Sequence, residues 1–158
     1  MIVDAQSVKN TDTATLKGYD AGKKVSGIKR HIAVDTQGLP HAVAVSTAAV
    51  TDRKGALQAL EHSKANLNEV QSIWADSGYV GEPFAQGVRD ILGQNVTVQI
   101  AKRSELHTFK VMPRRWVVER SFAWFEKNRR LWKNCERWLN TSLQFINLAF
   151  LAVLLRRS

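Results

Sequence analysis

The sequence predicts an α/β fold in which a mixed sheet carries helices on both faces and a helical extension follows at the C-terminus. Short β-branched segments come first, strand-like and helix-like segments then alternate, and the chain closes with an apolar helical stretch. At 158 residues, with 44% hydrophobic and 23% charged residues, the chain is long enough for one ordinary globular core. We therefore expect residues 1–158 to form a single domain.

The first third of the sequence predicts short strands. Residues 1–3 are apolar and end at Asp4, while residues 5–27 are polar and contain several glycines, which indicates a loop or an irregular hairpin. Residues 31–34 and 41–46 have strand character, and the polar, glycine-containing stretch 35–38 lies between them. That pattern is typical of a β-hairpin.

Alternating helices and strands follow the hairpin. Thr51-Asp52 is a typical helix start, residues 70–75 form an apolar strand, and residues 82–92 have helical spacing up to Gly93. Residues 96–100 form another β-branched strand. Three strands followed by α/β units is the ribonuclease-H-like order, which predicts a mixed sheet with helices on both faces.

The C-terminal part predicts two helices. Pro113 is well placed to open a long helix, and apolar residues spaced seven apart predict one buried stripe that continues to a break near Asn140. The stripe comprises Val117, Trp124, Leu131 and Trp138. We expect Trp124 and Trp138 to pack in the core and Cys135 to pack within the helix, with Trp116 and Trp132 undecided. Residues 143–155 form the last, apolar helix.

The charge balance favours a polyanionic partner. The chain has 23 Lys and Arg against 14 Asp and Glu, a net charge of +9 and a pI of about 10.1, which indicates nucleic acid. Several basic residues flank Glu119, and they would contact phosphates without regard to base sequence; a solvated helix face is the alternative. They are Lys102, Arg103, Arg114, Arg115, Arg120, Lys127 and Arg130.

Composition excludes several other classes. Cys135 is the only cysteine, so neither a disulfide within the chain nor a cysteine zinc cluster can form. The longest apolar run, 148–155, is far shorter than the roughly 20 residues that span a bilayer. We expect a cytoplasmic, nucleoid-associated protein with no membrane partner.

Three acidic residues are candidates for a metal site. Asp4 and Asp76 each follow a predicted strand, and Glu119 lies in a predicted helix. Ligand sites in open α/β sheets gather beyond the strand ends, and a few carboxylates suffice to bind the Mg²⁺ ions that catalyse phosphodiester chemistry. Without a bound cation, the negatively charged carboxylates of such a cluster repel one another.

Each acid also has a purely structural alternative. Asp76 precedes Ser-Gly and could cap a turn, and Glu119 could pair with Arg115 one helical turn earlier. Other aspartates compete with Asp4 for its role, namely Asp12, Asp20 and Asp35. We expect Asp35 to serve the hairpin turn.

Four blocks of the sequence resemble the catalytic half of DDE transposases from bacterial insertion sequences, most closely the insertion-sequence-five group. The blocks are residues 3–9, 27–35, 75–79 and 113–124, in the order of the family, and together they cover nearly the whole chain. The resemblance implies a ribonuclease-H-like fold and a catalytic triad made of Asp4, Asp76 and Glu119. It also implies that these acids hold two Mg²⁺ ions, for which Mn²⁺ can substitute, and that Arg115 is the arginine four residues before the glutamate.

The same resemblance implies DNA cleavage followed by strand transfer. The partners would be double-stranded DNA, as transposon ends and target, and further copies of the protein assembled on that DNA. The chain departs from the family at Met112, where many relatives have tyrosine, and at Glu126, where many have a basic residue. Lys127 follows one position later, rotated roughly 80° from the face of Glu119.

The family usually has a further N-terminal region that recognises transposon ends, and we expect it to be absent from this chain, which starts three residues before Asp4. Either an upstream reading frame supplies that region through frameshifting, or the chain is a remnant. The alternatives to an active transposase domain are therefore a catalytically silent DNA-binding or regulatory fragment and a cellular ribonuclease-H-like nuclease.

Overall fold

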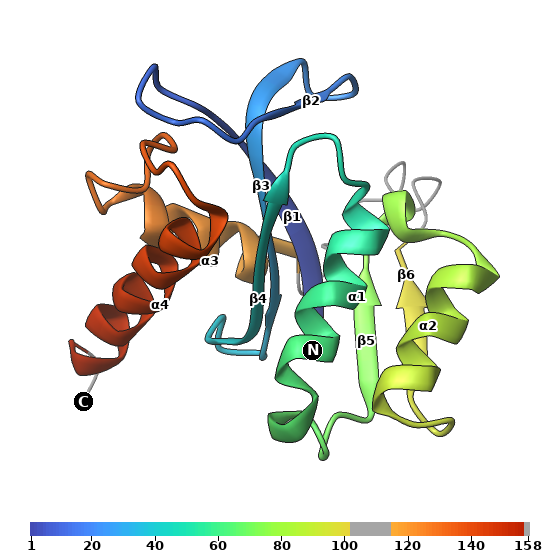
Figure 1. Cartoon of the computed structure of the whole chain (residues 1–158). Coiled ribbons are helices and arrows are strands. Elements are labelled where there is room, and N and C mark those ends of the chain that lie inside the picture. Colours follow the sequence, from blue (N-terminus) through green and yellow to red (C-terminus); the bar gives the residue numbers. More distant parts are fainter. Residues whose placement is uncertain (102–114, 157–158) are drawn as a thin grey trace.

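A computed structural model describes residues 1–101 and 115–156, and in it a curled mixed sheet separates two groups of helices (Figure 1). The strands within these ranges are β1 (Ile2–Lys9), β2 (Gly18–Asp20), β3 (Val25–Val34), β4 (Pro40–Thr47), β5 (Ser72–Ala75) and β6 (Thr97–Ile100). The helices are α1 (Asp52–Ser63), α2 (Glu82–Leu92), α3 (Arg115–Glu126) and α4 (Leu139–Leu155), with short 3₁₀ turns at Lys64–Asn66 and Ser77–Tyr79. No helix in the described ranges is long and apolar enough to cross a membrane.

The sheet is mixed, as predicted. Strand β3 pairs antiparallel with β1 on one side, and β2 and β4 pair with successive parts of its other side. Strand β5 runs parallel to both β1 and β6, so the strand order along the main path is β2-β3-β1-β5-β6. The parallel strands are reached through α1 and α2, as a parallel connection requires.

Helices cover both faces of the sheet, which confirms the expected architecture. Alternation along β1 sends Val3 to one face and Ile2 to the other. Val3 belongs to a core that includes residues of α1 and α2, such as Leu60 and Phe84. Ile2 belongs to a second core with Phe125 of α3 and Ile146 of α4. The two cores fix both helix layers to one central strand.

Of the two expectations for residues 5–27, the loop is wrong over β1, whereas an irregular hairpin does form where β2 pairs antiparallel with the start of β3. Strand β1 continues to Lys9, and each of its residues has a partner on β3, which starts at Val25. The polar residues that suggested a loop are satisfied by distant groups, because Ser7 donates a hydrogen bond to Asp20 (2.7 Å) and Gln6 donates one to Glu126 (2.8 Å). Asp4 therefore lies inside a strand rather than at its tip.

The single long helix expected up to residue 140 is also wrong. Helix α3 ends at Glu126, residues 127–138 are irregular, and α4 begins at Leu139. Buried polar bonds hold the irregular stretch: Arg30 donates to the Leu131 carbonyl (2.6 Å), and Ser142 donates to the Asn134 side chain (2.6 Å). The bond from Arg30 satisfies a backbone carbonyl that a helix would otherwise pair internally, and the bond from Ser142 ties the irregular stretch to α4.

Because the long helix does not form, the expected positions of its tryptophans and of Cys135 change as well. Trp138 stands immediately before α4 and is 67% exposed, so its predicted core role is wrong, and Trp124 is only partly buried. Cys135 lies outside any helix and is partly buried. Of the last three residues of the predicted stripe, Trp124, Leu131 and Trp138, only Leu131 is buried in the core.

Several elements match the prediction. The β3–β4 hairpin forms, and Asp35 accepts hydrogen bonds from the backbone of Gln37 and Leu39 in its turn. Thr51 caps α1 by accepting from the Lys54 backbone, and Gly93 ends α2 with a φ of 119°. The predicted bounds of α2 are the observed ones.

Gly55 provides a test of how closely α1 approaches the sheet. A Cβ at this position would collide with the buried ring of His31 on β3. Although alanine favours a helix by about 1 kcal/mol over glycine, we expect Gly55→Ala to lower the free energy of unfolding by about 1–3 kcal/mol, because neither the ring nor the strand can yield. Urea denaturation measures the change.

Gly87→Ala in α2 is the matched control. Its added Cβ meets only the methyl groups of Leu57, which can rotate away. Equal stability changes for the two variants would contradict a specific clash at His31.

Candidate functional site

Two of the three candidate acids lie side by side at one edge of the sheet. Strands β1 and β5 run parallel, with Ile2 opposite Trp74 and the Trp74 backbone N–H donating to the Met1 carbonyl at 2.8 Å. Continuing this register by two residues brings Asp4 opposite Asp76. Because β5 ends at Ala75 while β1 continues, both carboxylates stand where β5 ends.

Local hydrogen bonds orient both carboxylates. Asp76 Oδ1 accepts from the Gly78 backbone N–H at 2.8 Å and so starts the 3₁₀ turn Ser77–Tyr79. Asp4 Oδ1 accepts from the backbone N–H of Ala5 at 2.7 Å. The capping role considered for Asp76 is therefore real, and it fixes the side chain at the sheet edge.

Tyr79 lies close enough to these acids for their charges to act on its hydroxyl. Its ring packs against Phe84 with centroids 5.2 Å apart, and its hydroxyl is buried without a hydrogen-bond partner among the described residues. Burial raises the pKa of Tyr79 well above its usual value, and the charges of Asp4, Asp52 and Asp76 raise it further. Three carboxylates from β1, α1 and the end of β5 thus act on one hydroxyl group.

Glu119 stands on the helix that packs along β1. Val117 shares a core with Ile2 at the start of the strand, and Glu126 accepts a hydrogen bond from Gln6 farther along it. Helix α3 therefore follows β1 in the same direction, and exposed Glu119 lies between these two contacts. Asp4 occupies the corresponding middle position on the strand, on the face that Ile2 and Gln6 share.

The donor chemistry of this edge suits a hard divalent cation. Asp4 and Asp76 offer carboxylate oxygens, which Mg²⁺ prefers. Within the described ranges, no three His, Cys, Asp or Glu side chains already stand close enough together to hold a metal ion. The structure brings Asp4 and Asp76 together, and it places Glu119 on the adjacent helix.

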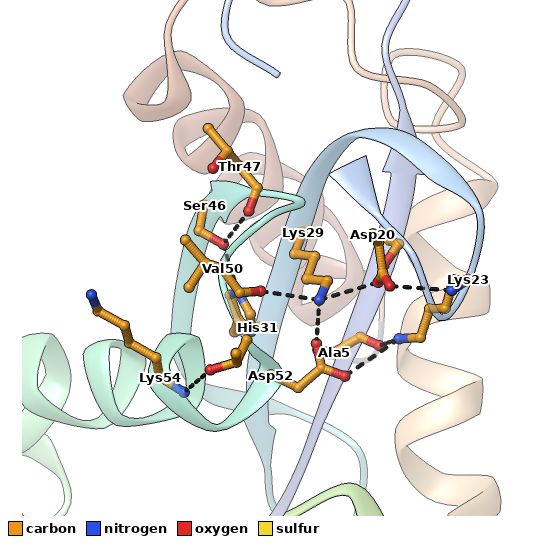
Figure 2. A network of polar contacts seen from close by, with 12 residues as sticks. Ala5, Asp20, Lys23, Lys29, His31, Ser46, Thr47, Val50, Asp52 and Lys54 are labelled. Atoms are coloured by element: carbon orange, nitrogen blue, oxygen red, sulfur yellow. Dashed lines mark hydrogen bonds and ion pairs between the residues drawn. The ribbon is translucent and has the colours of Figure 1, made fainter. Parts of the chain in front are cut away.

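A buried ionic network lies beside the acids and fastens α1 to the sheet (Figure 2). The buried Lys29 ammonium on β3 lies 2.8 Å from Asp52 in the first turn of α1, 3.1 Å from Asp20 on β2, and 3.0 Å from the Val50 carbonyl. Lys23 donates to the Ala5 carbonyl at 2.9 Å and lies 3.6 Å from Asp52.

The network shifts the pKa values of Asp20 and Lys29. Burial alone would raise the pKa of Asp20, but hydrogen bonds from Ser7, the Lys23 backbone and Lys29 outweigh it and lower the pKa to about 2. Burial would lower the pKa of Lys29, yet bonding to Asp52 and Asp20 raises it. Both groups therefore remain charged at neutral pH.

His31 is a buried neutral histidine next to this network. Ser46 donates to the Thr47 carbonyl (3.1 Å), so its oxygen accepts from His31 Nε2 (2.8 Å), and this arrangement assigns the proton to Nε2. His31 Nδ1 is buried without a partner in the described part of the chain. Burial lowers the pKa of His31 to about 4.

The basic residues expected to contact DNA fall into different settings. The Arg120 guanidinium lies 4.6 Å from the Trp116 ring centroid and 5.0 Å from that of Trp124, and it donates to the Gln37 carbonyl at 2.7 Å, so it joins α3 to the hairpin turn. Lys127 is exposed, and Arg130 pairs with Glu136 at 2.7 Å while remaining 57% exposed. Lys102, Arg103 and Arg114 lie outside the described residues, as does the side chain of Arg115.

Sequence reasoning missed Tyr79, Asp52 and Lys29 as neighbours of the acids. A signal existed for Tyr79, which follows Asp76 within the block 75–79. The sequence carried no signal for Lys29. Only the folded arrangement, in which β3 pairs with β2 and packs against α1, shows that this lysine is buried between two aspartates.

Comparisons with known proteins agree on one family. The sequence model of the family described as Transposase DDE domain matches residues 1–155. A putative transposase for insertion sequence element IS402 from Burkholderia cepacia is 31% identical over 129 residues, which cover 77% of this chain and 60% of that protein. The chain thus spans less than two thirds of the length of this relative.

The fold has a counterpart among solved structures. A chain in the structure of the simian T-cell lymphotropic virus intasome, in complex with the PP2A regulatory subunit B56 gamma, matches with a TM-score of 0.52 and 16% identity. The match covers 94% of this chain and 45% of the other. It agrees with the ribonuclease-H-like fold that the strand order predicts.

We expect His31 to make the protein less stable in acid. Between pH 6.5 and about 4 the unfolded histidine binds a proton that the folded one does not, so the free energy of unfolding falls as the pH falls across this window. The loss reaches about 3 kcal/mol. Urea denaturation at a series of pH values should show a steep slope in the wild type and a flatter one in His31→Gln. Parallel slopes would exclude His31 as the cause, since Asp20 acts only below about pH 4.

Removing the Tyr79 hydroxyl tests whether it lacks a partner. Because a buried, unpaired hydroxyl costs free energy, Tyr79→Phe should raise the free energy of unfolding by about 1 kcal/mol. Tyr19→Phe at an exposed position is the control and should change nothing. A clear loss of stability in Tyr79→Phe would mean that the hydroxyl is bonded in solution.

Proposed function

Because this chain belongs to the DDE transposase family of bacterial insertion sequences, we propose that it is a transposase catalytic domain that cleaves DNA phosphodiester bonds and transfers the freed strand. The observation that carries the proposal is the register that brings Asp4 beside Asp76, next to the helix that bears Glu119.

Asp4, Asp76 and Glu119 would hold two Mg²⁺ ions, or Mn²⁺ in their place. When bound, such a pair of ions activates the attacking oxygen and stabilises the leaving oxygen of an in-line displacement. Asp4 contributes a rigid carboxylate, because its strand is paired on both sides. Asp76 is held by its turn, and Glu119 would reach the ions from an exposed helix face.

The basic residues around Glu119 would bind the DNA backbone. Exposed Lys127 and Arg130 support this role, and we extend it to Lys102, Arg103, Arg114 and Arg115 on the sequence pattern alone. Arg120 supports the site differently, since its two tryptophans and the Gln37 carbonyl hold its guanidinium against the hairpin turn.

The proposed partners are transposon ends and target DNA, with several copies of the protein assembled on them in the cytoplasm, at the nucleoid. The chain matches only part of its relative from Burkholderia cepacia. From the family resemblance, we also propose as a partner an N-terminal transposase part that is encoded in an upstream reading frame and recognises the transposon ends.

Asp76→Asn tests the catalytic assignment. The variant keeps the oxygen that caps the turn but loses the charge that a cation needs, so metal-dependent nicking of transposon-end DNA should fall by about 10³-fold, while DNA binding persists. Asp90→Asn, on the exposed surface of α2, is the matched control and should cut normally. Full nicking activity in Asp76→Asn would refute the assignment.

The same assay separates the alternatives. A folded wild type that binds DNA but gives no product with Mg²⁺ or Mn²⁺ would indicate a silent DNA-binding or regulatory fragment. Cleavage of RNA–DNA hybrids or junctions without strand transfer would indicate a cellular nuclease.

A further inference from the structure

The irregular segment after α3 carries an exposed tryptophan among basic residues. Trp132 is 62% exposed, and the Lys133 ammonium lies 4.5 Å from its ring centroid. A large aromatic side chain left in water forgoes the stabilisation that its burial would give, and its ring stays available for contact with a ligand.

Both sides of Trp132 are firmly anchored. The carbonyl of Leu131 accepts from buried Arg30 at 2.6 Å. The Asn134 backbone N–H donates to the Lys9 carbonyl at 2.9 Å, and its carbonyl accepts from Thr11 at 2.9 Å. The backbone that bears Trp132 is thus set before any ligand arrives, which reduces the entropy lost on binding.

A second segment joins this one to form a continuous surface. Thr13 donates to the Cys135 carbonyl at 3.0 Å, and Thr15 donates to the Arg137 carbonyl at 2.7 Å. We call residues 9–17 and 126–137 together the basic platform.

The platform is strongly positive. It contains seven basic and three acidic residues, and two of the acids are engaged, Glu136 by Arg130 and Glu126 by Gln6. The basic residues are Lys9, Lys17, Lys127, Arg129, Arg130, Lys133 and Arg137. Such a surface attracts a polyanion.

We propose that the basic platform binds unpaired nucleotides of DNA and that Trp132 stacks on one of their bases. Phosphate contacts alone would need no exposed aromatic ring, whereas single strands are held by stacking on aromatic side chains between cations. The platform begins where α3 ends, on the helix that carries Glu119. The inference rests on the proposed DNA function and adds that this surface binds unpaired rather than duplex DNA.

The test compares the binding of a labelled single strand of about 20 nucleotides with that of the matching duplex, by fluorescence anisotropy without a divalent metal. Trp132→Ala should weaken single-strand binding about 5- to 100-fold and change duplex binding less than about 2-fold. Trp132→Phe should retain most of the affinity, because the ring remains.

Trp138→Ala is the matched control, because Trp138 is similarly exposed, at 67% against 62% for Trp132, and no cation lies over its ring in the described part of the chain. It should leave both affinities unchanged. Thermal melting of each variant checks that the fold survives, and Trp132→Phe keeps the test valid if Trp132→Ala does not fold.

Equal losses for single strand and duplex, or no loss at all, would overturn the inference. So would a change in self-association of Trp132→Ala without a change in DNA affinity, which would assign the surface to a protein contact. Since the assay requires no cleavage, single-strand binding that depends on Trp132 can stand even if the catalytic proposal fails. If Trp132→Ala still cuts DNA and binds single-stranded and duplex DNA as tightly as the wild type, the catalytic proposal stands. Only the proposal of single-strand binding is then removed.

Discussion

The double pairing of β1 is the constraint on which the rest of the structure depends. One edge of the strand is bonded to β3 along its full length, and the other meets β5 in parallel. Alternate side chains of β1 then enter two different cores, so the strand fixes both helix layers at once. The same pairing sets Asp4 level with Asp76 and aligns α3 beside them.

Two buried cations on neighbouring positions of β3 extend this arrangement outward. Lys29 points to the α1 face, where Asp20 and Asp52 neutralise it. Arg30 points to the opposite face and bonds to the Leu131 carbonyl, while burial lowers its pKa to about 10. Removing one partner from such a buried bond leaves a charge without compensation, which is strongly destabilising. The two layers are thus secured by polar contacts that tolerate few substitutions.

The sequence allowed the fold class, the hairpin and α2 to be predicted, because local signals mark them. Gly93 ends α2, and Asp35 shapes the hairpin turn through its own backbone neighbours. The extent of β1 could not be predicted, because the partners that satisfy Gln6 and Ser7 come from distant segments. The end of α3 was missed because Leu131 continues the apolar spacing although its carbonyl is bonded to Arg30. For the candidate site, the sequence supplied the acids, but only the strand register relates Asp4 to Asp76.

The pairing of Ile2 with Trp74, from which the placement of Asp4 beside Asp76 follows, joins positions 72 residues apart along the chain. Contacts of such long sequence separation form slowly, because the intervening loop must first be closed. The hairpin, α1 and β5 all lie between the two acids, so they must be synthesised before the carboxylates can meet. A nascent or truncated polypeptide that stops short of Asp76 therefore cannot form the acidic pair, because the chain must pass through the hairpin, α1 and β5 before the second carboxylate exists.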